Sequence, residues 1–177
     1  MKSIIFSLFL ILSCLSFAYS QQVEIYTKVG QQAPTFTITD INGKEFNSAE
    51  FKGKVVFVVF WATWCPYCRE EMPHLENEIW RKYKSEDFVM LAIAREQTNE
   101  EISSFRERNK IGFPIAADPM GEVFKLFGNR GVPRSYIIDR KGKILFQSIG
   151  LDPEEFDTRK NIIEKELNRI KKEKTEE

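Results

Sequence analysis

The feature that most constrains this chain is an apolar run that leads directly into a Cys-x-x-Cys pair. Residues 55–61 are all apolar, which favours a central β-strand covered on both faces. Cys65 and Cys68 follow closely, and Pro66 suits the first position of a helix because it has no amide hydrogen to lose there. The sequence therefore predicts a strand, a turn and a helix, with both cysteines at the start of the helix.

The rest of the sequence predicts strands and helices in alternation, closed by a hairpin. Alternating or continuous apolar residues predict strands, and amphipathic spacing after a capping residue predicts helices. The predicted strands are residues 35–39, 45–47, 55–61, 88–94, 114–117, 134–139 and 143–149. The predicted helices are residues 66–83, a helix capped by Thr98, residues 119–127, and a last helix capped by Asp152. This order predicts an α/β fold with a central mixed β-sheet flanked by helices and an N-terminal β-hairpin extension.

The first twenty residues have the pattern of a secretory signal peptide. A basic start precedes an apolar run over residues 4–17 and a small-x-small cleavage site at residues 18–20. The run is shorter than the roughly 20 apolar residues of a spanning helix. In a second interpretation, residues 11–14 resemble the lipobox of bacterial lipoproteins and Cys14 anchors a lipoprotein; in a third, the segment is an uncleaved anchor. We expect an exported protein, periplasmic or otherwise extracytoplasmic, where disulfides persist.

Composition and charge divide the 177 residues into four segments. They are the signal peptide 1–20, a polar lead-in 21–32, one globular domain 33–170 and a charged tail 171–177 that is predicted to be disordered. The 26 basic and 26 acidic residues cancel, so no net field attracts nucleic acid or an anionic membrane. We expect a monomer with no nucleic-acid partner.

The cysteines at the predicted helix start have the chemistry of a redox pair. Unpaired amides and a partial positive charge at a helix start stabilise a thiolate. Cys65 is predicted to be the exposed nucleophile and Cys68, one turn inside, the buried resolving thiol, so that the pair alternates between dithiol and disulfide. Zinc needs two more ligands, and after cleavage of the signal peptide only His74 remains to supply one, so we expect no metal and no cofactor beyond the Cys65–Cys68 pair.

Residues 60–73, FWATWCPYCREEMP, resemble the active-site segment of the thioredoxin superfamily, in particular of the exported TlpA and ResA-like thiol-disulfide oxidoreductases. Residues 30–36, 131–133 and 136–142 are similar to other landmarks of that family. The resemblance implies a thioredoxin-like fold and reduction of disulfides in exported client proteins. It also implies a membrane electron donor of the thiol-disulfide interchange type.

The resemblance assigns roles to residues around the pair. Pro133 matches a proline that faces the disulfide after a cis peptide bond, and Val132 would pair its backbone with the extended chain of a substrate. Pro73 matches the proline that bends the active-site helix. The substrate-binding residues that the resemblance implies are Trp64, Pro66, Tyr67, Val132 and Pro133.

Two departures from the family pattern leave two properties undetermined: the base that takes the Cys68 proton and the redox potential of the cysteine pair. Val59 occupies the position of the buried aspartate of thioredoxin. Glu71 matches a glutamate of ResA-like proteins, and it is interpreted either as the catalytic base that takes the proton of Cys68 or as a surface acid in a helix first turn. The intervening Pro66-Tyr67 pair is typical of glutaredoxins, which leaves the redox potential undetermined.

Other functions use the same residues differently. A disulfide oxidase or isomerase runs the exchange in the other direction. A thiol peroxidase of the peroxiredoxin type needs Pro-x-x-x-Thr/Ser-x-x-Cys, and here Val58 and Ala62 occupy the first two of those positions. A noncatalytic module with a structural Cys65–Cys68 bridge would gain little stability from so small a loop.

Four other side chains are assigned no catalytic role by the sequence. Trp61 is expected to pack around the site, as is Trp64, for which shaping of the substrate surface is the alternative. His74 is expected at or near the surface because it lies nearly two helical turns beyond Cys68. Arg134 is expected to be a solvated charge at the rim of the site.

Overall fold

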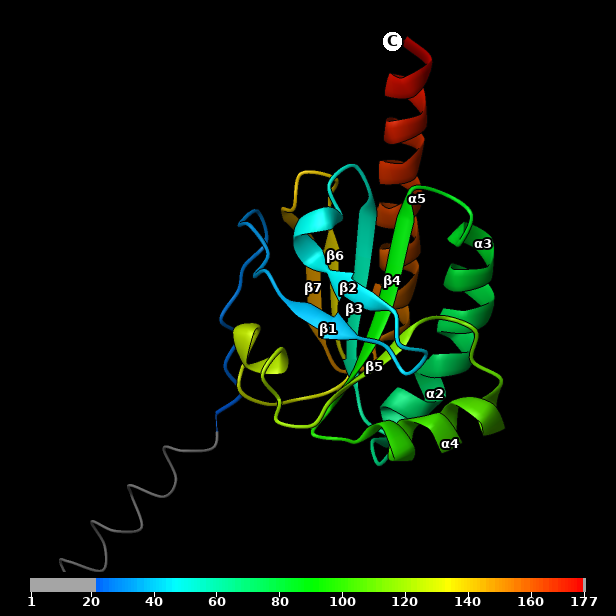
Figure 1. The fold of residues 1–177 in the computed structure, drawn as a ribbon. Coiled ribbons are helices and arrows are strands. Elements are labelled where there is room, and N and C mark those ends of the chain that lie inside the picture. Colours follow the sequence, from blue (N-terminus) through cyan, green and yellow to red (C-terminus); the bar gives the residue numbers. More distant parts are fainter. Residues whose placement is uncertain (1–21, 177) are drawn as a thin grey trace, which may run out of the picture.

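The computed structural model describes residues 22–176, so the predicted signal peptide and Cys14 lie outside the described residues. Its centre is a five-stranded sheet in the order β5-β4-β3-β6-β7 (Figure 1). The strands are β3 (Val55–Trp61), β4 (Phe88–Arg95), β5 (Ile115–Asp118), β6 (Arg134–Ile138) and β7 (Ile144–Ile149). β3, β4 and β5 are parallel, whereas β6 and β7 run antiparallel to their neighbours. The predicted mixed sheet is confirmed.

The apolar run of residues 55–61 forms the middle strand of this sheet. β3 pairs with β4 on one side and with β6 on the other, so that Val56 lies opposite both Val89 and Ile138. Every residue of β3 is buried, because helices cover one face of the sheet and aromatic side chains cover the other. The C-terminal end of β3 is the point from which the cysteine segment leaves the sheet.

The long helices pack on one face of the sheet. They are α2 (Pro66–His74), the π-helical turn η3 (Leu75–Trp80) and α3 (Arg81–Tyr83), which follow one another directly, and then α4 (Asn99–Asn109) and α5 (Pro153–Glu176). Pro73 lies inside α2 and cannot donate a helical hydrogen bond, and the π-helical turn begins two residues later. The predicted capping box of α4 is present, with Thr98 and Glu101 bonding to each other's backbone amides.

The opposite face carries the smaller elements. The hairpin of β1 (Thr37–Thr39) and β2 (Glu45–Asn47) crosses it, followed by the 3-10 turn η2 (Ser48–Glu50), as Figure 1 shows. A second core lies beneath them, formed by Phe36, Phe46, Val56, Val58, Phe60, Phe124 and Phe127. The lead-in follows the sheet edge, where Ile25 bridges to Gly128 and Gln32 bridges to Lys143. The predicted N-terminal hairpin extension is confirmed.

One predicted helix is wrong. Residues 119–127 were expected to be helical, but only the 3-10 turn η4 (Phe124–Leu126) forms there. The Asp118 carboxylate accepts hydrogen bonds from the amides of Val123 and Phe124, and Gly121 adopts a positive φ of 65°. Both features fix a turn where the sequence pattern favours a helix.

The predicted disordered tail also differs from the structure. α5 continues to Glu176, and two lysines of its last turns form ion pairs with the loop before β4. Lys171 lies 2.8 Å from Glu86, and Lys174 lies 2.7 Å from Asp87. Across residues 22–176, no helix combines the length and the apolar content needed to cross a bilayer.

Candidate active site

The two cysteines lie at the junction where β3 ends and α2 begins, as the sequence predicts. Cys65 is the N-cap residue of α2 and Pro66 occupies the first turn. The Sγ atom of Cys65 accepts a hydrogen bond from the backbone amide of Cys68 at 3.3 Å. The sulfur thus satisfies an amide that the helix itself leaves unpaired, and it sits in the partial positive charge of the helix start.

Cys65 is buried, which corrects the prediction of an exposed sulfur. Its side chain is 4% exposed, and its thiol donates to the carbonyl oxygen of Val132 at 3.5 Å. The peptide bond between Val132 and Pro133 is cis, as the family resemblance implies. This loop covers the sulfur, whereas Trp64 and Tyr67 beside it are each 61% exposed.

Cys68 is fully buried one turn inside α2, as predicted. Desolvation raises the pKa of this thiol well above its ordinary value of 9.0, and the hydrogen bond with Cys65 and the charges of Cys65 and Glu71 act in the same direction. Cys68 therefore keeps its proton at neutral pH unless a nearby base takes it.

Glu71 is buried against Arg159, which excludes the interpretation of Glu71 as a surface acid. Both side chains are 1% exposed, and Nη1 of Arg159 lies 2.5 Å from Oε1 of Glu71. Burial raises the pKa of Glu71 above its ordinary value, and the adjacent guanidinium opposes that rise. Val59, at the position of the thioredoxin aspartate, is apolar and fully buried. Among these candidates only Glu71 offers a carboxyl group near Cys68.

Two residues of the site are missing from the sequence prediction. Gln97 is 2% exposed and makes two hydrogen bonds with Thr63. Its side-chain oxygen accepts from the Thr63 backbone amide at 2.7 Å, and its side-chain nitrogen donates to the Thr63 hydroxyl at 2.6 Å. It fixes the turn that precedes the cysteines. Arg159 comes from α5, and a signal for it exists: it lies three residues after Phe156 and four before Ile163, on the buried face of that helix.

Arg134 is buried, so the prediction of a solvated rim charge is wrong. It shares the face of β6 that Tyr136 and Ile138 line, away from the long helices. Its guanidinium donates to backbone carbonyl oxygens of Phe127 at 3.0 Å, Arg130 at 2.5 Å and Glu24 at 3.4 Å. Arg134 therefore ties the lead-in segment to the sheet.

The other two assignments agree with the structure. The imidazole of His74 is 60% exposed and bonds to Glu78 at 2.8 Å. Trp61 is fully buried and packs against Phe105, with 5.0 Å between ring centroids.

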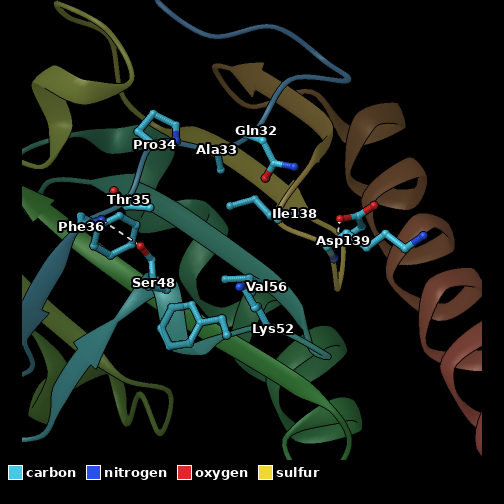
Figure 2. A pocket seen from close by; sticks show the side chains of 14 residues that line it. Gln32, Ala33, Pro34, Thr35, Phe36, Ser48, Lys52, Val56, Ile138 and Asp139 are labelled. Carbon is cyan, nitrogen blue, oxygen red and sulfur yellow. Dashed lines mark hydrogen bonds between the residues drawn. The ribbon is translucent and has the colours of Figure 1, made fainter.

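A separate cavity of about 290 Å³ lies on the hairpin side of the sheet. Figure 2 shows Ala33, Phe36, Val56 and Ile138 lining it, with the Ser48 hydroxyl bonded to the Phe36 amide. Val56 is near the start of β3 and Cys65 follows its end, so this cavity and the cysteines lie at opposite ends of the strand. Within the described part of the chain, no cluster of three or more His, Cys, Asp or Glu side chains could hold a metal ion.

The known proteins that resemble this chain include thiol-disulfide oxidoreductases, as the cysteine pair suggests. The model of the AhpC/TSA family matches residues 29–147. The thiol-disulfide oxidoreductase ResA of Bacillus thuringiensis subsp. konkukian is 38% identical over 118 residues, which cover 67% of this chain and 68% of that relative.

Two solved structures have the same fold. A candidate protein disulfide isomerase from Bacteroides thetaiotaomicron superposes with a TM-score of 0.80 at 33% identity, covering 84% of this chain and 95% of that one. A candidate thiol:disulfide interchange protein DsbE from Chlorobium tepidum superposes with a TM-score of 0.72 at 31% identity, covering 79% and 98%. The predicted thioredoxin-like fold class is therefore confirmed.

Proposed function

The chain belongs to the AhpC/TSA family and is a relative of the thiol-disulfide oxidoreductase ResA, and from that premise we propose that it reduces disulfide bonds in exported client proteins. The protein is a thiol-disulfide oxidoreductase. One observation carries the proposal: the Cys65 sulfur lies between the start of α2 and the carbonyl of Val132. There it can meet a substrate strand and attack a client disulfide as a thiolate.

The first step is attack by Cys65. Its thiolate, stabilised by the helix start and the Cys68 amide, attacks one sulfur of the client disulfide. A Cys65–client bond forms, the client disulfide breaks, and the other client sulfur leaves as a thiolate that takes a proton from water. The half-buried backbone of Val132, beside the buried Pro133, would pair with the extended client chain, while Trp64, Pro66 and Tyr67 face outward.

The second step is resolution by Cys68. Glu71 takes the proton of Cys68, and the resulting thiolate attacks the Sγ atom of Cys65. The Cys65–Cys68 disulfide forms, and the second client sulfur leaves as a thiolate that takes a proton from water. The client has gained two electrons and two protons, while the protein has lost two electrons and the Cys68 proton, which Glu71 passes to water. We assign Cys65, Cys68 and Glu71 as the catalytic residues and no cofactor besides the cysteine pair.

The predicted export supports this direction of exchange. The signal-peptide pattern of residues 1–20 would carry the protein to a compartment where client disulfides form, with a lipid anchor at Cys14 as the alternative. Each turnover leaves the cysteine pair oxidised, so a membrane electron donor of the thiol-disulfide interchange type would restore the dithiol. We expect the protein to act as a monomer.

A peroxidase function is less well supported by this chain. The positions from which a peroxiredoxin activates peroxide are occupied by Val58 and Ala62, both fully buried and without a hydroxyl group. A disulfide isomerase or oxidase is the stronger second candidate, because the relative from Bacteroides thetaiotaomicron is described as a candidate protein disulfide isomerase.

The midpoint potential of the Cys65–Cys68 pair separates these directions. The protein would be equilibrated in graded thiol buffers and the oxidised fraction measured. A value near or below roughly −230 mV supports client reduction. A value of roughly −120 to −180 mV contradicts it and assigns oxidation or isomerisation instead.

A further inference from the structure

We propose that Arg159 is a positioning residue of the exchange reaction, which holds Glu71 as a carboxylate beside Cys68 so that Glu71 can accept the Cys68 proton. This inference rests on the proposed function, since it concerns the resolving step. Arg159 lies on α5, far from the cysteines in sequence, and it touches neither of them in the described structure.

The guanidinium of Arg159 is fixed by three elements. Its Nη1 atom donates to Glu71 of α2 at 2.5 Å and to the Ser135 hydroxyl of β6 at 2.9 Å. Its Nε atom donates to the carbonyl of Glu155, in the preceding turn of α5, at 3.4 Å. The guanidinium carbon also lies 5.1 Å from the ring centroid of Phe156. The charge that faces Glu71 is therefore held in one place.

Glu71 is placed to exchange a proton with Cys68. The two residues are three apart on α2 and are both buried, so they are neighbours on one helix face. The charge of Glu71 already contributes to the raised pKa of Cys68. The contact with Arg159 engages Oε1 of Glu71, which leaves Oε2 to accept a proton.

A groove of about 240 Å³ between α2 and α5 has Glu71 among its lining residues, although the Glu71 side chain is only 1% exposed. The titratable and charged groups that face Glu71 or this groove are Cys68, Glu70 and His74 of α2, Glu78 of η3, and Asp157, Arg159 and Lys160 of α5. Of these, Arg159 alone is a fully buried cation.

The cation decides whether Glu71 can act as a base. Burial favours the neutral carboxylic acid, which has no capacity to accept the proton of Cys68. An opposite charge at hydrogen-bond distance favours the carboxylate. Without Arg159, Glu71 would remain protonated to a higher pH, and resolution would require a more alkaline solution.

The test follows both sulfur steps in one reaction. Reduced protein is mixed with dithiobis(nitrobenzoic acid), whose coloured nitrothiobenzoate is released once when Cys65 attacks and again when Cys68 resolves the mixed disulfide. The rates of the two phases are measured against pH by stopped flow. The first phase reports Cys65 and serves as an internal control.

In Arg159→Met we expect the acid limb of the second phase to move to higher pH by about one to three units, with the first phase unchanged. Arg159→Lys, which keeps the charge, should return the limb toward the wild-type position. Arg159→Gln, which keeps hydrogen-bond donors, should show the same shift and replaces Arg159→Met if that variant does not fold. Arg169→Met, on an exposed part of the same helix, is the matched control and should leave both phases unchanged.

Two outcomes overturn the inference. One is a second phase with the wild-type pH profile in both Arg159→Met and Arg159→Gln. The other is a shift by Arg159→Met that persists in the Glu71→Gln background, because the effect would then not pass through Glu71. A wild-type protein that never releases the second nitrothiobenzoate would instead contradict the proposed function itself.

Discussion

Arg159 Nη1 lies 2.5 Å from Oε1 of Glu71, and each side chain is 1% exposed. Transfer of either charge from water to such a site is costly, and the opposite charge of the partner compensates for much of that cost. Arg159→Ala leaves Glu71 buried without its cation, so we expect the free energy of unfolding to fall by about 3–5 kcal/mol. Urea unfolding of the reduced protein measures this loss.

Two companion variants test whether the loss comes from the buried charge. Arg159→Met combined with Glu71→Leu removes both ions and should recover most of the stability. Lys172→Ala breaks an ion pair with Glu176 whose side chains are 77% and 64% exposed, and should cost about 1 kcal/mol or less. Equal losses of unfolding free energy in Arg159→Ala and Lys172→Ala would contradict the claim that burial makes the Glu71–Arg159 pair costly to break.

The buried thiol of Cys68 should make the reduced protein sensitive to alkali. Its pKa is raised in the folded state, so above pH 9.0 the unfolded chain loses this proton while the folded chain retains it. The stabilising contribution is complete below pH 9.0 and declines as the pH rises further. Wild type should lose about 1.4 kcal/mol per pH unit more than Cys68→Ala in that range, as measured by urea unfolding under a reductant. Parallel losses in the two proteins would mean that Cys68 ionises freely in the folded state.

Replacing one cysteine or the other should have opposite effects on the mixed disulfide with a client protein. Cys68→Ser retains the nucleophile but cannot resolve the intermediate, so it should accumulate a mixed disulfide with a client protein. Cys65→Ser should form none, because Cys68 is fully buried. Non-reducing electrophoresis and intact-mass spectrometry distinguish the two cases. An adduct on Cys65→Ser alone would reverse the assigned roles.

Local sequence patterns were sufficient to predict much of this structure. The apolar run of β3, the helix start at Pro66 and the capping box of Thr98 are each determined by residues within one or two turns of one another. The cis bond before Pro133 followed from the family resemblance, because local sequence alone favours trans.

The errors at the site concern contacts between distant segments. Cys65 is buried by Val132, 67 residues later, and Glu71 is buried by Arg159, 88 residues later. Arg134 was expected in solvent because no local pattern shows that the carbonyls of Glu24 and Phe127 converge on it. Such placements depend on how the sheet and α5 bring the chain together, which hydrophobic periodicity does not specify.

The exposed aromatic side chains beside Cys65 should bind client proteins without stabilising the fold. Trp64 and Tyr67 are each 61% exposed, and aromatic residues often supply much of the binding energy at protein interfaces. We expect Trp64→Ala to lower kcat/KM for a disulfide-bonded client protein about tenfold, which corresponds to about 1.4 kcal/mol, while the reduction of glutathione disulfide and the unfolding free energy stay nearly constant. Tyr26→Ala, which removes an aromatic ring that is 54% exposed on the lead-in segment, is the control and should change neither rate. Equal losses with the client protein and with glutathione disulfide would show instead that Trp64 acts on the Cys65 sulfur, because a small disulfide makes few contacts beyond it.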